Sequence, residues 1–404
     1  MAYIIFVNPA ILHETGMPLA AVVAATCLCA GFGSVLMGVL ARYPIALAPG
    51  MGLNAYFTYS VVKGLGVPWQ TALGAVFLSG IAFLILTVLG VRQMIVSAIP
   101  HELYAAVAVG IGLFIALIGL HNSGIIVANK DTLVAMGNLK SPHTLLAITG
   151  LMLIAALLAW RIRGAILLGI LGTTGLGIAV GLVHWQPQSY SAAAITATAF
   201  QLNIRGAIGY GLIEIVFVFL FVDLFDNVGT LVAVGKQARL FDKSNQIPRI
   251  NRILFADATA TVVGSLAGTS TVTSYIESAA GVAAGGRSGI TAITAGLLFC
   301  CALFVAPVVG AIPSAATAPA LIVVGSLMLA HAAEIPWSNP VVSVPAFLTI
   351  LTIPLTFSIA NGLAFGFTAY VVVKVARGEF RSVSWLVYLL AALFIARFVY
   401  LGSI

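Results

Sequence analysis

Long apolar stretches with almost no charge constrain this chain more than any other feature. Stretches of about 20 apolar residues, the length that crosses a hydrocarbon core about 30 Å thick, recur from one end of the sequence to the other. Only 7% of the 404 residues are charged. Soluble domains carry about 25% charged residues, so this chain could not cover itself with a water-facing surface. The strict alternation of membrane-barrel strands is absent, which leaves an all-α polytopic membrane protein as the prediction.

The apolar stretches predict about fourteen transmembrane spans, and one more at 384–401 that either crosses the membrane or lies at its surface. The first seven are expected near 2–12, 19–40, 45–62, 68–90, 102–120, 144–161 and 164–184. The second seven are expected near 209–235, 251–267, 271–284, 289–311, 316–332, 341–358 and 360–375. The third and tenth are too short and too rich in Gly, Pro, Ser and Thr for a plain lipid-facing helix, so we expect both to be interrupted.

The basic residues predict which connectors face the cytoplasm. The connector after the eighth span carries a single acid, Asp242, and these basic residues: Lys236, Arg239, Lys243, Arg249 and Arg252. An excess of Lys and Arg is typical of a cytoplasmic connector. With alternating spans the N-terminus is cytoplasmic too, in a multi-pass protein of the inner or plasma membrane. The net charge of +7 is not gathered on an amphipathic face, so no nucleic acid partner is expected.

The two sets of seven spans share a weak internal match. Residues 47–48 and 56 match residues 266–267 and 275 at one common spacing, which also brings residues 6 and 8 onto 225 and 227. Because seven spans reverse the direction through the membrane, this match predicts an inverted repeat. Interrupted segments at matching positions of two such halves are the best sequence indication of a transporter's binding site.

Acids inside the predicted spans are the strongest candidates for function, because each costs roughly 2.5–3.5 kcal/mol at a helix centre. They are Glu214, Asp223, Asp226, Asp257 and Glu277. Asp223 and Asp226 are three residues apart and so share a helix face. Each acid could simply bond a neighbouring helix, most readily Glu214 near an outer end. Glu277 stands among the Gly, Ser and Thr of the interrupted tenth span, which predicts one wall of a polar pocket.

Several longer blocks resemble a known family. They are "NPAIL" (8–12), "YPIALAPGMGLNAYFTYSVV" (43–62), "DLFDNVGTL" (223–231), "FADATATVVGSLAGTSTVTSYIESAAGV" (255–282) and "TFSIANGLAFGF" (356–367). These blocks look like the purine permeases of the nucleobase–cation symporter group, and most like the adenine/guanine/hypoxanthine (azaguanine-sensitivity) branch. The resemblance covers nearly all of the chain. Such permeases usually carry residues before the "AYI" at 2–4, so an N-terminal turn is expected to be missing here.

The resemblance implies the fold of uracil permease. That fold has fourteen spans in two inverted repeats of seven, with short antiparallel strands in the broken spans 3 and 10. Spans 1–4 (1–98) and 8–11 (208–311) would form a core domain. Spans 5–7 (99–207) and spans 12–14 with the C-terminal helix (312–404) would form a gate domain, through which a homodimer is a further expectation.

The resemblance also implies which residues bind the base. By motif, Asp226 and Glu277 take the roles of the two binding acids and Asn54 that of the third-span asparagine. We predict Glu277 as the main base-binding carboxylate and Asp226 as the proton carrier. Carboxylates accept the N–H donors of a purine, and aromatic rings can stack on its face. The predicted site also includes Gly52, Tyr56, Phe57, Phe225, Asn227, Thr230, Tyr275, Ile276 and Ser278, with Asp223 and Asp257 as further candidates for proton coupling.

Together these features predict a secondary active transporter, not an enzyme, that imports adenine, guanine or hypoxanthine by proton symport through an elevator or rocking mechanism. The proton is the coupling ion, and no other cofactor or metal is expected. The same fold could instead carry uracil, xanthine or an anion, although two acids without Arg or Lys disfavour an anion. A membrane-embedded enzyme is the last alternative. However, "GRSG" at 286–289 has no catalytic histidine on a nearby span, and "HEL" at 101–103 lacks the second histidine of a zinc site.

Overall fold

Apolar helices make up most of the computed structural model, which describes residues 1–90, 100–183, 192–209, 213–238, 247–305, 309 and 312–400. A helix satisfies its own backbone hydrogen bonds, which lipid cannot do, so apolar sequences of this length fold as helices. Six described helical segments are long and apolar enough to cross a bilayer: Leu19–Ala41, Trp69–Val88, His101–Asn122, Pro142–Ala159, Ser314–Glu334 and Ile359–Ala376. The prediction of a helical multi-pass membrane protein is confirmed.

The first half of the chain contains the interrupted third span and a short hairpin between longer helices. In order, its elements are α1 (Ile4–His13), α2 (Leu19–Leu36), η1 (Met37–Ala41), β1 (Leu47–Pro49), α3 (Met51–Ala55), η2 (Tyr56–Gly64), α4 (Trp69–Val88), α6 (His101–Asn122), β2 (Ile126–Asn129), β3 (Leu133–Met136), α7 (Pro142–Ala159), α8 (Ala165–Ala179), α9 (Ala192–Ile195) and α10 (Ile204–Gly209).

The second half contains the interrupted tenth span. Its elements are α11 (Ile213–Ala238), α12 (Ile250–Ala267), β4 (Val272–Ser274), α13 (Ser278–Ala283), α14 (Gly289–Ala302), η3 (Leu303–Val305), α16 (Ser314–Met328), η4 (Leu329–Glu334), α17 (Pro340–Leu355), α18 (Ile359–Ala376), η5 (Phe380–Ser382) and α19 (Trp385–Tyr400). Each predicted span contains one or more of these elements. Arg239, Asp242 and Lys243 of the basic connector lie outside the described residues.

The two interrupted spans meet as a pair of short antiparallel strands, as predicted. β1 pairs with β4, with Leu47 opposite Ser274 and Pro49 opposite Val272. Two further backbone bonds extend the ladder, from Gly50 N to Thr271 O (2.9 Å) and from Tyr275 N to Ala46 O (3.1 Å). All six strand residues are buried. The pairing therefore satisfies backbone groups that would otherwise be left open inside the bundle.

In each strand, a hydroxyl from a neighbouring helix hydrogen-bonds both the backbone N–H and the backbone C=O of the first residue. Ser34 Oγ of α2 accepts from Leu47 N (2.8 Å) and donates to Leu47 O (3.0 Å). Thr261 Oγ1 of α12 accepts from Val272 N (3.3 Å) and donates to Val272 O (3.0 Å). Both hydroxyls are fully buried. The two broken spans are thus held by equivalent contacts, each from the helix that precedes it.

The internal match drawn from the sequence is wrong in its register at this place. It aligned residues 47–48 with residues 266–267, but Leu266 and Ala267 form the end of α12, whereas the strand that pairs with β1 begins at Val272. Leu and Ala suit a buried strand and a helix end equally well, so their identity did not identify structurally equivalent positions.

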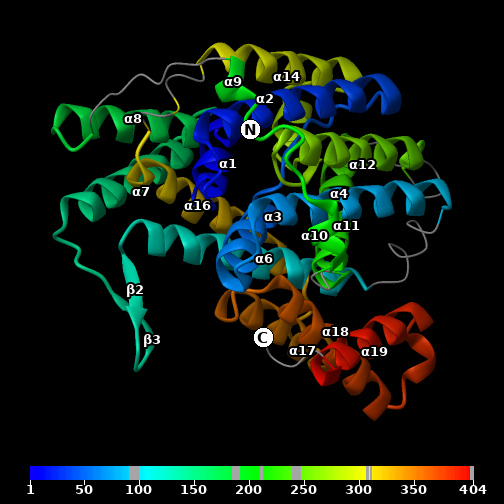
Figure 1. Ribbon diagram of the computed structural model, residues 1–404. Helices are drawn as coiled ribbons and strands as arrows, with labels where there is room; N and C mark the ends of the chain where they lie inside the picture. Colours follow the sequence, from blue (N-terminus) through cyan, green and yellow to red (C-terminus); the bar gives the residue numbers. More distant parts are fainter. Residues whose placement is uncertain are drawn as a thin grey trace.

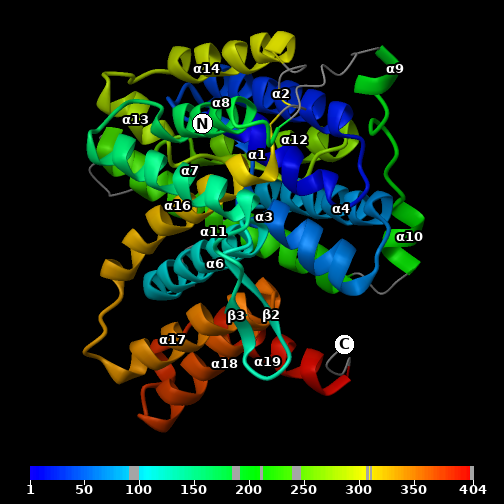
Figure 2. The same ribbon diagram turned by 90° about the vertical axis from the view of Figure 1, so that its left-hand side faces the viewer.

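The helices pack in two groups, and both views place α2, α12 and α14 toward one end of the molecule and α17, α18 and α19 toward the other (Figures 1 and 2). In one group, α2 packs against α1, α12 and α14, and α4 packs against α11 and α12. In the other, α6 packs against α16, α17 and α18, while α7 packs against α8 and α16. Contacts between the groups include those of α3 and α11 with α6, and of α1 with α16.

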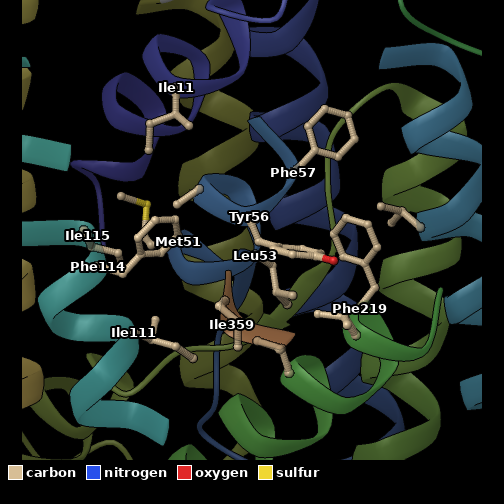
Figure 3. Packing of buried hydrophobic residues seen from close by; sticks show 14 of the residues in the cluster. Ile11, Met51, Leu53, Tyr56, Phe57, Ile111, Phe114, Ile115, Phe219 and Ile359 are labelled. Atoms are coloured by element: carbon tan, nitrogen blue, oxygen red, sulfur yellow. The ribbon is translucent and has the colours of Figure 1, made fainter. Parts of the chain in front are cut away.

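The contact between α3 and α6 is apolar. Figure 3 shows Met51 of α3 close to Phe114 and Ile115 of α6, and all three side chains are buried. Gly52 is nearest to α6: a Cβ there would lie 2.6 Å from Ile111 Cγ2. The interface between the two groups is therefore tight but has no directional bonds at this point.

Close packing of α2 and its extension η1 against α14 gives a first prediction. A Cβ at Gly38 would lie 2.5 Å from the backbone oxygen of Gly289, so Gly38→Ala must push the two helices apart. Overpacking of this kind costs about 1–3 kcal/mol. We expect a lower melting temperature for purified Gly38→Ala protein. Gly175→Ala on α8 is the matched control, because a Cβ there meets nothing within 4 Å. Equal melting temperatures for both variants would contradict the close packing.

Candidate functional site

Two predicted acids lie beside the paired strands. Asp226 lies on α11 and its carboxylate reaches the end of β1, since a Cβ at Gly50 would be 3.5 Å from Asp226 Oδ2. Glu277 follows β4 directly and precedes α13. The charges of Asp226, Asp257 and Glu277 are close enough to interact. The lack of a side chain at Gly50 matters for the strand pair itself, since a Cβ there would lie 2.9 Å from Thr273 Cγ2 of β4.

Two tyrosines complete this centre. The Tyr3 hydroxyl donates to Glu277 Oε1, and the Tyr275 hydroxyl donates to the backbone oxygen of Pro49 at 2.5 Å. Both phenols lie within electrostatic range of Asp226 and Glu277. The centre therefore joins α1, both strand ends and α11 in one polar cluster.

Exposure separates the four acids of this region into two pairs. Asp226 and Glu277 are partly accessible, whereas Asp223 and Asp257 are buried, at 1% and 0% exposure. Asp257 Oδ1 accepts from the backbone N–H of Ser274 (3.1 Å) and from its hydroxyl (3.4 Å), so it holds the end of β4. Asp223 Oδ2 accepts a hydrogen bond from the hydroxyl of Thr261 (3.5 Å), which also bonds the backbone of Val272 at the start of β4. The first pair therefore keeps some exposed surface and the second pair keeps almost none.

Asn54 lies in a fully buried polar network, and both ends of its amide are bonded to protein groups. It donates to Asn8 Oδ1 on α1 and accepts from the hydroxyl of Ser270. Asn8 in turn donates to the hydroxyls of Thr26 (2.7 Å) and Thr269 (3.1 Å). Asn54 thus ties the third span to the first and the tenth, and a base contact from its amide would have to replace one of these bonds.

The predicted aromatic residues are packed rather than open. Tyr56 and Phe57 are buried and lie against Phe219 of α11, with ring centroids 5.2 and 6.4 Å away (Figure 3). Tyr275 is buried and bonded as described above. The side chain of Phe225 lies outside the described part of the structure.

The remaining predicted residues occupy different surroundings. Asn227 is fully buried and donates to Ser274 Oγ (3.3 Å), while Ser278 Oγ accepts from Ala46 N (3.0 Å). Thr230 is buried on α11, and Ile276 is 41% exposed beside Glu277. Gly52 packs on Ile111 of α6. The side chain of Glu214 lies outside the described residues.

Sequence reasoning missed Tyr3 and the hydroxyls that surround the strands. Tyr3 is a polar aromatic at the start of an apolar span, and nothing in its spacing relates it to Glu277, 274 positions away. Asn8 was singled out only through the internal match. Among the described residues, no three His, Cys, Asp or Glu side chains are arranged to hold a metal ion. The centre can accept hydrogen bonds from a neutral solute and can carry a proton.

The network around Asn54 gives a second prediction. Asn54→Ala leaves Asn8 and Ser270 without a buried partner, which costs about 1–3 kcal/mol, and we expect a lower melting temperature. Loss of the Asn54 amide should also weaken or change the recognition of solutes. Competition by a panel of purine analogues measures this change. An unchanged competition profile at reduced stability would mean that Asn54 supports the site without touching the solute.

Comparison with known proteins identifies the family of this chain. Residues 1–399 match the model of a family described as the Permease family. The chain is 44% identical to the adenine permease AdeP of Escherichia coli (strain K12), over 100% of this chain and 91% of AdeP. It is 45% identical to the guanine/hypoxanthine permease PbuG of Bacillus subtilis (strain 168), over 99% of this chain and 94% of PbuG.

A solved structure supports the fold at low identity. The transmembrane domain of a cyanobacterium bicarbonate transporter, BicA, superposes with a TM-score of 0.67, covering 89% of this chain and 94% of that domain. Only 15% of the residues are identical, so this likeness concerns the fold alone.

Proposed function

This chain belongs to the Permease family, and from that premise we propose that it imports a purine nucleobase, adenine, guanine or hypoxanthine, by proton symport. It is a membrane transporter and not an enzyme, as its relatives are permeases. Similar identity to an adenine permease and to a guanine/hypoxanthine permease supports the substrate class and leaves the exact base open.

The observation that carries the proposal is that Asp226 and Glu277 both lie beside the paired strands, close enough for their charges to interact. Two accessible carboxylates present acceptors only, which suits a neutral base with N–H donors. Within the described part of the chain, the charges that act on Asp226 are those of Asp257 and Glu277 and not of an Arg or Lys, in contrast to what an anion would require. Uracil and xanthine, also neutral bases, remain the competing solutes.

We propose that the fold has fourteen spans in two inverted repeats of seven. The equivalent hydrogen bonds from Ser34 to the first residue of β1 and from Thr261 to the first residue of β4 support this symmetry. The group that contains α1–α4 and α11–α14 would be the core domain, and the group that contains α6–α8 and α16–α18 the gate domain, through which two copies would pair. The N-terminus would face the cytoplasm of a cell with this protein in its inner or plasma membrane.

Alternating access would then arise from movement of the core against the gate, as an elevator or by rocking. Polar contacts join the proposed core and gate domains, which supports the proposal that the protein is closed at this side of the membrane. Asn122 at the end of α6 donates to Glu14 (3.2 Å) and to Tyr59 OH (3.0 Å), and Ser60 donates to the backbone oxygen of Phe357. These exposed bonds can break and reform at low cost, unlike the buried bonds inside the core group.

Uptake assays test the substrate class directly. We expect cells that lack their own nucleobase permeases to accumulate labelled adenine, guanine or hypoxanthine when they express this protein, and to do so faster than uracil or xanthine. Cells that express Glu277→Gln should show no uptake, because the amide replaces the acceptor with a partial donor. Transport of uracil without any purine would refute the proposal.

Separate roles for the two acids can be tested by comparing binding with accumulation. Two neighbouring carboxylates repel when both are charged, so one can carry a proton while the other binds the base. Asp226→Asn should bind purine in calorimetry but fail to concentrate it under an imposed pH gradient. Glu277→Gln should lose binding itself.

If Asp226→Asn still concentrates purine when the gradient is applied, the proton travels by another residue. Asp223 and Asp257 are then the next candidates, and the proton must reach them through the bonds that hold β4.

A further inference from the structure

We propose that Tyr3 is a positioning residue for base recognition. Its hydroxyl holds one oxygen of Glu277, so that the carboxylate presents its other oxygen to the base in a fixed direction. This inference rests on the proposed function, since it specifies how the binding carboxylate of that site is oriented.

The contact itself is specific. Tyr3 is 3% exposed, and its hydroxyl donates to Glu277 Oε1, while Glu277 remains partly accessible. Within the described part of the chain, Tyr3 is the side chain that hydrogen-bonds this carboxylate. Tyr275, the other phenol of the centre, uses its hydroxyl on Pro49 O and so orients the strands instead.

The backbone that carries Tyr3 is itself held in place. Tyr3 immediately precedes α1, and Asn8 lies five positions further along, about 7.5 Å up the helix at 1.5 Å per residue. Asn8 bonds Thr26 of α2, Thr269 before β4, and Asn54 of α3. These bonds join α1 to the interrupted third and tenth spans, and the tenth span also carries Glu277. They therefore hold the Tyr3 phenol in a fixed position relative to the Glu277 carboxylate.

The Glu277 carboxylate would be free to rotate without this contact. It directly precedes the short α13, and its side chain has several rotatable bonds, so an unheld carboxylate would lose freedom when a base binds. Holding Oε1 beforehand removes that cost, which is the general way in which preorganisation raises affinity. The base then meets Oε2 and the remaining acceptor site of Oε1 in a constant geometry.

Tyr3→Phe tests the proposal because it removes only the hydroxyl. We expect the KM for the transported purine, and its Kd by calorimetry on purified protein, to rise by up to about tenfold, because the base must then order the Glu277 side chain when it binds. The maximal rate should stay within about twofold, since the contact acts on binding. Tyr43→Phe is the matched control: it also removes a buried phenol bond, from Tyr43 OH to Pro248 O (2.6 Å), away from the site.

A second background shows whether Tyr3 acts through Glu277. Glu277→Asp keeps the acceptor but draws it back by one methylene, out of reach of Tyr3. In that background Tyr3→Phe should change the Kd by less than about twofold, because the contact is already lost. Equal losses of affinity in both backgrounds would overturn the proposal.

Three outcomes remain distinct. If wild-type protein binds purine and Tyr3→Phe binds it equally well, the inference about Tyr3 fails while the proposed function stands. If Tyr3→Phe does not accumulate in membranes although Tyr43→Phe does, the hydroxyl serves folding and the inference also fails. If wild-type protein binds no purine, the proposed function fails first.

Discussion

The structure depends on pairing the backbone groups that two interrupted helices leave open inside the bundle. An unpaired buried N–H or C=O has no water to bond, so a break in a membrane helix is tolerated only where protein satisfies it. β1 and β4 satisfy each other along one edge. Ser34 and Thr261 satisfy the first residue of each strand, and Asp257 satisfies Ser274 at the end of β4. One of the buried acids is thus part of the scaffold.

The candidate site follows from this pairing. Each strand runs directly into a short helix, β1 through Gly50 into α3 and β4 through Glu277 into α13, and the antiparallel pairing places these two turns at opposite ends of the ladder. Asp226 of α11 lies against Gly50, and the Tyr275 hydroxyl bonds Pro49 O of the other strand. Glu277 therefore lies where the chain leaves regular structure, and Asp226 reaches the strands from the middle of α11.

Sequence reasoning predicted a helical multi-pass membrane protein, because lipid imposes one simple rule on apolar sequences of this length. It also located both breaks, since Gly, Pro, Ser and Thr gather there. The register of the internal match was wrong, because Leu and Ala do not distinguish the end of α12 from a strand. The partners of Asn54 and Glu277 could not be predicted, because Asn8, Ser270 and Tyr3 approach them only through packing of distant spans. The hairpin of β2 and β3 was also missed, since short, mostly exposed strands carry little pattern.

The distribution of polar and apolar contacts agrees with the movement proposed for this fold. Within the core group, directional bonds tie α1, α2, α3 and the strands into one unit, so this unit should move without internal change. Between α3 and α6 the contact of this unit is made by apolar side chains such as Met51 and Ile115 (Figure 3), whereas Asn122 at the end of α6 bonds Glu14 and Tyr59. Apolar contacts are non-directional, and one such surface can exchange for another with little loss. A site whose two acids and tyrosines all belong to the rigid unit would then keep its geometry while the side of the membrane that it faces changes.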